Sequence, residues 1–186
     1  MQEPFPVEEL TIVRLKPGIS VEKFDCGNDD LNDFIRSDAF VYAERKLAQT
    51  FIALYKNEPI AFISVCTDAI RLGMKERKDE FGKEKPHVDY PGIKVARLAT
   101  ATPYKSRGVG AFLVKYIVGK AIAISEEVGC RFVTVDAYPA QLKFYAELGF
   151  VKNLSDSSGA NVSMRLDIYQ WNRQVEKAGS AQGNGA

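Results

Sequence analysis

The chain has 186 residues, enough for one domain with a substantial core; 46% are hydrophobic and 26% are charged. Its 25 basic and 24 acidic side chains leave a formal net charge of +1. This balance argues against a polyanion-binding domain, which usually carries a clear excess of Lys and Arg. No stretch approaches the roughly 18 consecutive apolar residues of a membrane span, and the N-terminus lacks the order of a secretory signal. We therefore expect a cytoplasmic protein with no membrane partner.

The first elements along the chain are a strand and two helical stretches. Residues 8–16 partly alternate between polar and apolar side chains and contain β-branched residues, which predicts a strand. Asn28 precedes two acidic residues, a pattern typical of a helix N-cap with acids facing the positive end of the helix dipole. A second helical stretch is expected over residues 39–47.

A hairpin and a charged segment follow. Residues 50–55 and 60–67 are apolar, β-rich runs separated by Lys-Asn-Glu-Pro, a turn composition, and they predict a β-hairpin. Residues 71–90 are dense in charges of both signs, which indicates an exposed helical turn and loop. A mobile loop that borders a substrate cleft is the alternative.

The pattern is more regular from residue 93 onward. It predicts a strand over 93–100, a long helix over 108–127 and another strand over 131–136. A short helix over 139–148 has proline in its first turn and Gly149 just past its end, the expected asymmetry.

The end of the chain supplies closing strands and a tail. Phe150 and residues 162–169 are expected to be strands, while residues 175–186, rich in glycine and polar residues, are expected to be a disordered tail. Strands and helices alternate, which indicates an α/β fold in which a mixed sheet is covered by helices on both faces. We expect a single domain over residues 1–174.

One turn has the features of a phosphate-binding site. A strand runs through a basic, glycine-containing turn straight into an apolar helix, whose first amides are unpaired and lie at the positive end of the dipole. Gly108 and Gly110 let the chain approach a ligand closely, and Lys105 and Arg107 add positive charge. Such a turn can hold a pyrophosphate. Glycines that serve only tight packing are the alternative.

A second segment carries an aromatic pair. A buried strand over 133–136 ends in a turn, and the short helix after it contains Phe144 and Tyr145. Phe144 lies one turn before Leu148, so we expect it to point into the core and Tyr145 to face a cleft edge. Tyr145 as a packed core aromatic is the alternative.

Together the two segments resemble the GNAT superfamily of N-acetyltransferases. The family signature is Gln/Arg-x-x-Gly-x-Gly/Ala at a helix start, followed downstream by Phe-Tyr-x-x-x-Gly-Phe. This chain has Lys105-x-x-Gly108-x-Gly110 and then Phe144-Tyr145-Ala-Glu-Leu-Gly-Phe150. The resemblance extends over roughly residues 8–170. It implies a mixed, mostly antiparallel central sheet with helices on both faces, and acetyl-coenzyme A as cosubstrate.

The resemblance also implies roles for particular residues. Backbone groups at the end of the strand expected over residues 93–100 would pair with the pantetheine arm and stabilise the oxyanion. The turn that follows this strand would hold the pyrophosphate. Tyr145 resembles the family's general acid, which protonates the departing sulfur. Lys105 replaces the usual Gln or Arg and lacks a guanidinium fork. Tyr138 and Gln141 replace the usual Asn and Ala. The implied cofactor-binding residues are Leu98, Ala99, Thr100, Lys105, Ser106, Arg107, Gly108, Val109, Gly110 and Ala111.

Neither a general base nor a metal site can be identified from the sequence. Glu44, Asp68 and Asp136 are candidates for the base by placement, and the one histidine, His87, lies in the charged segment. One histidine and three widely separated cysteines without a Cys-x-x-Cys pair give no support for a metal site.

The acceptor amine is open at this point. The main interpretation is an enzyme that acetylates a primary amine of a small molecule or protein by direct transfer. A toxin of a toxin–antitoxin pair that acetylates aminoacyl-tRNA is an alternative, because residues 24–35 look like the opening helix of such toxins (Phe-Asp-Cys-Gly, then Leu-Asn). The near-neutral charge disfavours tRNA. A non-catalytic relative that binds acetyl-coenzyme A is the third possibility. A homodimer is compatible with each.

Overall fold

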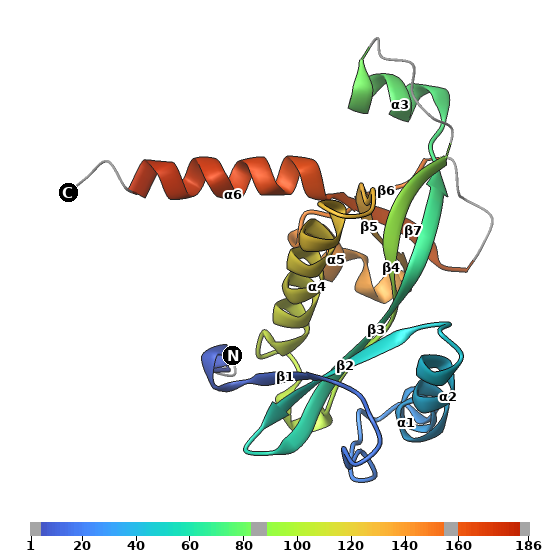
Figure 1. The fold of residues 1–186 in the computed structure, drawn as a ribbon, viewed down its shortest axis with the longest axis vertical. Helices are drawn as coiled ribbons and strands as arrows, with labels where there is room; N and C mark the ends of the chain where they lie inside the picture. Colours follow the sequence, from blue (N-terminus) through green and yellow to red (C-terminus); the bar gives the residue numbers. More distant parts are fainter. Residues whose placement is uncertain (1–4, 83–88, 155–159, 183–186) are drawn as a thin grey trace. The chain divides into compact units, whose positions relative to one another are not determined.

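A computed structural model describes residues 5–82, 89–154 and 160–182. The described strands form a seven-stranded sheet in the order β1-β2-β3-β4-β5-β7-β6, in which β1–β2, β2–β3, β5–β7 and β6–β7 are antiparallel pairs (Figure 1). This architecture confirms the predicted α/β fold with a mixed, mostly antiparallel sheet. The strands are β1 (Thr11–Arg14), β2 (Gln49–Tyr55), β3 (Glu58–Arg71), β4 (Asp89–Thr100), β5 (Phe132–Ala137), β6 (Val151–Lys152) and β7 (Val162–Asp167). The α-helices are α1 (Asp29–Asp33), α2 (Ala39–Glu44), α3 (Met74–Phe81), α4 (Val109–Ser125), α5 (Leu142–Glu147) and α6 (Ile168–Gln182).

The chain divides into two compact units. The first unit comprises Met1–Cys66 and Val95–Ile117, and the second comprises Thr67–Lys94 and Val118–Ala186. Strands β3 and β4 each contribute residues to both units. The single domain expected over residues 1–174 stays a prediction.

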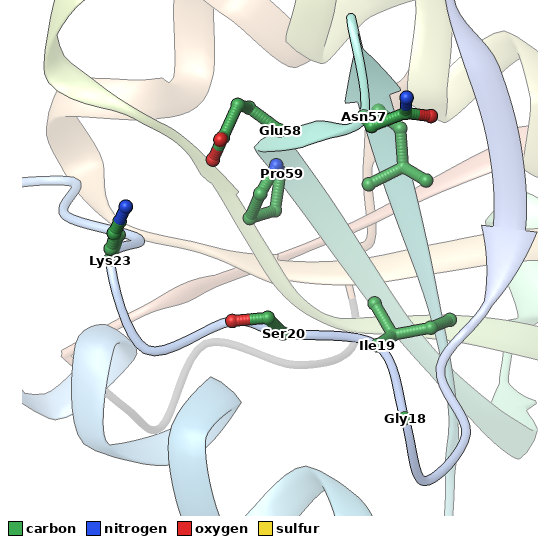
Figure 2. Close-up of a pocket in the computed structure, with 8 residues that line it drawn as sticks. Gly18, Ile19, Ser20, Lys23, Asn57, Glu58 and Pro59 are labelled. Atoms are coloured by element: carbon green, nitrogen blue, oxygen red, sulfur yellow. The ribbon is translucent and has the colours of Figure 1, made fainter.

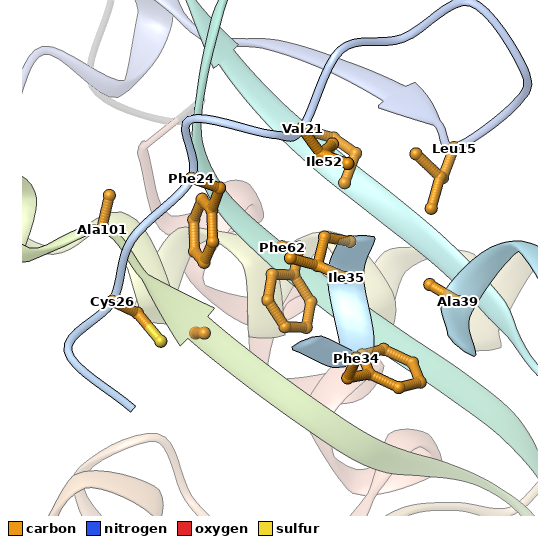
Figure 3. Close-up of a cluster of buried hydrophobic side chains, with 11 residues drawn as sticks. Leu15, Val21, Phe24, Cys26, Phe34, Ile35, Ala39, Ile52, Phe62 and Ala101 are labelled. Atoms are coloured by element: carbon orange, nitrogen blue, oxygen red, sulfur yellow. The ribbon is translucent and has the colours of Figure 1, made fainter. Parts of the chain in front are cut away.

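The core of the first unit joins the N-terminal helices to the sheet. Helix α1 begins as predicted, because the Asn28 side chain accepts a hydrogen bond from the Leu31 amide at 3.0 Å. The π-helix η2 (Phe34–Asp38) then links α1 to α2. In the buried cluster of Figure 3, the Phe62 ring lies 5.4 Å from the Phe24 ring and 5.9 Å from the Phe34 ring. Ala99 and Ala101 belong to the same cluster, so the end of β4 is packed against this core.

The second unit is organised around β5 and β7, which pair from Phe132↔Asp167 to Ala137↔Val162. The charged segment after β3 contains helix α3, and its last residue, Phe81, stacks on Tyr90 with ring centroids 4.8 Å apart. Glu76 of this helix is only 4% exposed. The exposed turn expected for residues 71–90 is therefore partly wrong, and residues 83–88 lie outside the described part.

The expected disordered tail is also partly wrong. Helix α6 begins at Ile168 and continues to Gln182, so residues 175–182 are helical, while residues 183–186 lie outside the described part. Residues 168–174 are already helical before Val175 is reached. Extension of a formed helix adds one hydrogen bond for each residue ordered, whereas the costly step is nucleation.

Among the described residues, no helix combines the length and apolarity needed to cross a bilayer.

Candidate active site

The phosphate-binding turn predicted from the sequence lies between β4 and α4. A 3-10 helix, η3 (Thr102–Tyr104), leads from the strand into residues 105–108. Ser106 and Gly108 both have left-handed φ angles, +59° and +90°. Such a φ costs a non-glycine residue about 1 kcal/mol, so the surrounding structure must hold Ser106 in place.

The first amides of helix α4 follow directly after this turn, and none of them makes an intrahelical hydrogen bond. Its first intrahelical hydrogen bond runs from the Phe112 amide to the Gly108 carbonyl at 3.0 Å. The amides of Val109, Gly110 and Ala111 come before that bond, at the positive end of a helix of 17 residues. This is the geometry with which helix N-termini bind phosphate groups.

The segment that begins the N-terminal helices supports the turn from one side. The Asp25 carbonyl accepts a hydrogen bond from the Thr102 amide at 3.0 Å. The Asp25 carboxylate accepts bonds from the Gly27 amide and the Asn32 side chain, both at 2.8 Å. The hydrogen bond from the Gly27 amide, followed by the bond from the Asn32 side chain, lowers the pKa of the Asp25 carboxylate below its usual range. The Phe-Asp-Cys-Gly and Leu-Asn residues are thus parts of one hydrogen-bonded unit fixed to the start of η3.

All ten predicted cofactor-binding residues lie in the first unit, and Tyr145 lies in the second. On β4, Ala99 is buried, while Leu98 and Thr100 are half-buried. The turn has exposed and half-buried members, and Val109 is fully packed. The roles predicted for the ten cofactor-binding residues and for Tyr145 stay predictions. Exposed residues are Lys105, Ser106 and Gly108; half-buried residues are Arg107, Gly110 and Ala111.

Tyr145 lies on helix α5 between two other rings. Its ring centroid is 4.9 Å from that of Phe144 and 5.3 Å from that of Phe150, both edge-on. It is 6% exposed, whereas Phe144 is half-buried, so the expected orientation of this pair is wrong. The helix ends at Glu147. Gly149 has a φ of +90°, which allows the Phe150 amide to donate a hydrogen bond to the Tyr145 carbonyl at 3.0 Å. Because the chain reverses direction at Gly149, the Phe150 ring packs against the Tyr145 ring. The periodicity of a helix does not predict this contact, since Phe150 lies outside the helix.

Burial keeps the Tyr145 phenol protonated. Desolvation raises its pKa from 10.0 to about 12. Among the described residues, no hydrogen bond of its hydroxyl is present. A neutral phenol throughout the physiological pH range is the state that a proton donor requires.

The raised pKa predicts a stability effect at alkaline pH. Between pH 10 and 12 the unfolded chain releases the Tyr145 proton while the folded chain keeps it, so stability falls as pH rises. We expect the wild type to lose up to about 3 kcal/mol relative to Tyr145→Phe over this range. Urea unfolding of both proteins at neutral pH and at several alkaline pH values measures the difference. A constant difference across the range would contradict the raised pKa.

The candidate general bases have different surroundings. Glu44 is exposed at the end of α2. Asp68 accepts a hydrogen bond from the Thr134 hydroxyl, and Asp136 forms an ion pair with Lys94. His87 lies outside the described residues. None of these contacts singles out one of the candidates as the base.

A cavity elsewhere in the first unit contains none of the predicted site residues. It has a volume of about 360 Å³ and lies between the loop around Ile19 and the β2–β3 turn, with Leu54 and Pro59 among its lining residues (Figure 2). No group of three or more His, Cys, Asp or Glu side chains in the described part of the chain is arranged to hold a metal ion.

Arg97 on β4 was not identified from the sequence, although it lies next to the candidate residues at the strand end. Its guanidinium carbon is 4.2 Å from the Phe34 ring centroid and 5.9 Å from that of Tyr42. No ion pair of Arg97 is present among the described residues. Guanidinium stacking on aromatic faces leaves N–H donors at the edge of the group free for an anion.

Comparisons with known proteins agree on one family. The model of the acetyltransferase (GNAT) family matches residues 19–150. A tRNA-acetylating toxin of Mycobacterium tuberculosis is 21% identical over 140 residues, which are 74% of this chain and 81% of the toxin.

Two solved structures have a similar fold. AtaT complexed with acetyl-methionyl-tRNAfMet has a TM-score of 0.77 at 20% identity and covers 89% of this chain and 99% of its own. A mutant of the AtaT toxin bound to the C-terminus of the antitoxin AtaR and acetyl-CoA has a TM-score of 0.70, also at 20% identity, with coverages of 87% and 95%.

Proposed function

Because this chain belongs to the GNAT family of acetyltransferases, acyltransferases with acetyl-coenzyme A as cosubstrate, we propose that its acceptor is the amino group of an aminoacyl-tRNA. The observation that carries this proposal is the similarity to the tRNA-acetylating toxin, which extends over 74% of this chain and 81% of the toxin. The same similarity favours the toxin over the small-molecule or protein acceptor that the sequence first indicated. An antitoxin partner and a cytoplasmic location belong to this proposal.

The distribution of charge supports a polyanionic substrate better than the net charge does. Residues 90–125, which include β4 after Asp89, the turn and α4, contain no acidic side chain. The acids of the chain lie elsewhere and cancel this local excess in the total. The basic residues of this run are Lys94, Arg97, Lys105, Arg107, Lys115 and Lys120. Coenzyme phosphates and an RNA backbone would both be attracted to such a run.

The chemistry assigned to the chain is direct acetyl transfer. The acceptor amine forms a bond to the acetyl carbon, the carbon–sulfur bond breaks, and the proton lost by the amine passes to water. The amides that open α4 would hold the pyrophosphate, and backbone groups of Leu98, Ala99 and Thr100 would orient the thioester. Tyr145 would donate its proton to the sulfur as it leaves.

A comparison of acceptors tests the proposal. Purified protein and acetyl-coenzyme A are incubated with a panel of aminoacyl-tRNAs, the deacylated tRNAs, and free amino acids and polyamines, and mass spectrometry identifies each acetylated amine. We expect acetylation of the aminoacyl-tRNAs alone. Acetylation of a free amine at higher kcat/KM than of every aminoacyl-tRNA would restore the small-molecule interpretation.

Arg97 provides a second test of the acceptor. We expect Arg97→Gln to raise the KM for aminoacyl-tRNA about tenfold, because one charge-assisted hydrogen bond to a phosphate contributes about 1.5 kcal/mol or more. Its affinity for acetyl-coenzyme A and its kcat should be unchanged. Arg14→Gln, which removes an exposed arginine of β1, is the control and should leave the KM unaltered. A lower melting temperature without a change in KM would make Arg97 a packing residue only.

A further inference from the structure

An N-terminal residue outside every predicted site contacts the phosphate-binding turn. Phe5 is 5% exposed, although it precedes the first strand by several residues. Its ring lies edge-on to two tyrosines, with centroid distances of 4.9 Å to Tyr55 and 5.6 Å to Tyr104. The two tyrosine rings are 6.3 Å apart, so the three rings form one aromatic cluster. Phe5 therefore joins the N-terminal segment to the β2–β3 hairpin and to the end of η3.

The backbone and side chain of Arg107 are held by the same residue. The Phe5 amide donates a hydrogen bond to the Arg107 carbonyl at 2.9 Å. The Arg107 guanidinium lies over the Phe5 ring, 5.2 Å from its centroid. Arg107 is the residue between Ser106 and Gly108, the two positions with left-handed φ angles. Phe5 thus contacts the turn at the centre of its unusual backbone conformation.

We propose that Phe5 is a positioning residue for acetyl-coenzyme A, which keeps the turn at 105–108 in the conformation that presents the α4 amides to the pyrophosphate. This inference rests on the proposed coenzyme site at residues 105–111. Among the described residues, the Asp25 carbonyl holds η3 at Thr102, just before the turn, and Phe5 contacts the turn itself at Arg107. A preorganised turn binds more tightly because less conformational freedom is lost on binding. Without Phe5 the turn would sample other conformations, and a non-glycine residue such as Ser106 would leave the left-handed region.

A purely structural role for Phe5 makes a different prediction. If the ring only filled space, its truncation would lower stability without a specific effect on coenzyme affinity. A matched control is Leu15→Ala, which truncates another buried apolar residue of the first unit; Leu15 is 3% exposed, and its amide donates to the Thr50 carbonyl. Leu15 also lies in the N-terminal part of the chain, where it directly follows β1.

The experiment uses the full chain and acetyl-coenzyme A. Isothermal calorimetry gives the Kd for wild type, Phe5→Ala, Phe5→Leu, Leu15→Ala and Gly110→Phe, and thermal melts confirm that each variant is folded. Gly110→Phe tests the site itself, because a bulky side chain in the first turn of α4 should abolish binding. Steady-state kinetics at saturating acetyl-coenzyme A give kcat for the variants that bind.

We expect Phe5→Ala to raise the Kd about tenfold with kcat within about twofold of wild type, while Leu15→Ala lowers the melting temperature and leaves the Kd unchanged. Phe5→Leu, which keeps apolar bulk but lacks the ring edges, should fall between wild type and Phe5→Ala, and it replaces the alanine variant if that one does not fold. An unchanged Kd for both Phe5 variants, with binding abolished in Gly110→Phe, would overturn the role of Phe5 alone. Unchanged binding by Gly110→Phe would overturn the coenzyme site, and the inference with it.

Discussion

Tyr145→Phe is expected to lower kcat about 100-fold or more and to leave the Kd for acetyl-coenzyme A unchanged. The substitution removes the hydroxyl and keeps the ring that packs edge-on against Phe144 and Phe150. No hydrogen bond of this hydroxyl is present in the described part of the chain, so its loss should not unsettle the helix. If proton donation to the sulfur limits turnover, the departing thiolate must then take its proton from water.

The size of this effect depends on how much help the leaving group needs. A free thiol has a pKa of about 8.5, so the thiolate is already a fair leaving group in water. With its pKa raised to about 12, Tyr145 is fully protonated at neutral pH but is also a weak acid. A large effect would therefore mean that the phenol is placed well for donation, since its acidity alone gives little advantage.

Steady-state and single-turnover kinetics, together with calorimetry, measure the loss. Tyr138→Phe is the matched control, because Tyr138 precedes η4 (Pro139–Gln141), the 3-10 helix that leads into α5, and is 68% exposed. We expect no change in its kcat. A decrease below about threefold in Tyr145→Phe, roughly 0.6 kcal/mol of barrier, with chemistry rate-limiting, would exclude Tyr145 from the mechanism.

Arg165→Ala is expected to destabilise the protein by about 3–5 kcal/mol. The Arg165 side chain is 6% exposed and forms ion pairs with Glu76 at 3.0 Å and Glu80 at 2.8 Å. Glu76 is itself 3% exposed at its side chain and also accepts hydrogen bonds from the amides of Leu154 and Gly73. Removal of the guanidinium leaves a buried carboxylate without its counterion, which is far more costly than the loss of a surface pair.

Thermal and urea unfolding measure this effect, and two further variants serve as controls. Arg71→Ala breaks the exposed pair with Asp89, whose side chains are 72% and 54% exposed, and should change stability by less than about 1 kcal/mol. In the double variant Arg165→Met with Glu76→Met, both charges are absent, and we expect part of the stability to return. Equal losses of unfolding free energy for Arg165→Ala and Arg71→Ala would show that the buried ion pairs of Arg165 stabilise the fold no more than an exposed pair does.

Local features of the site could be read from the sequence because they depend on neighbours in the chain. Asn28 caps α1, the Gly108 turn opens α4, and Gly149 ends the segment after α5 in a left-handed conformation. Each follows from backbone sterics or from helix-end hydrogen bonding within a few residues. The GNAT motifs consist of such local features, which is why the family and its fold could be predicted before the structure.

Only the tertiary structure decided which charges are buried and what holds the turn. Glu76 lies in a run of charges that the sequence indicated as exposed, and it is buried because Arg165, distant in the chain, supplies its counterion. Phe5 precedes every predicted element, yet its ring and amide fix Arg107. Periodicity and composition report the environment of a residue within its own element. Burial of a charge, or support of a strained turn, depends on partners that the folded chain brings together from distant positions, because only such a partner offsets the desolvation or the strain.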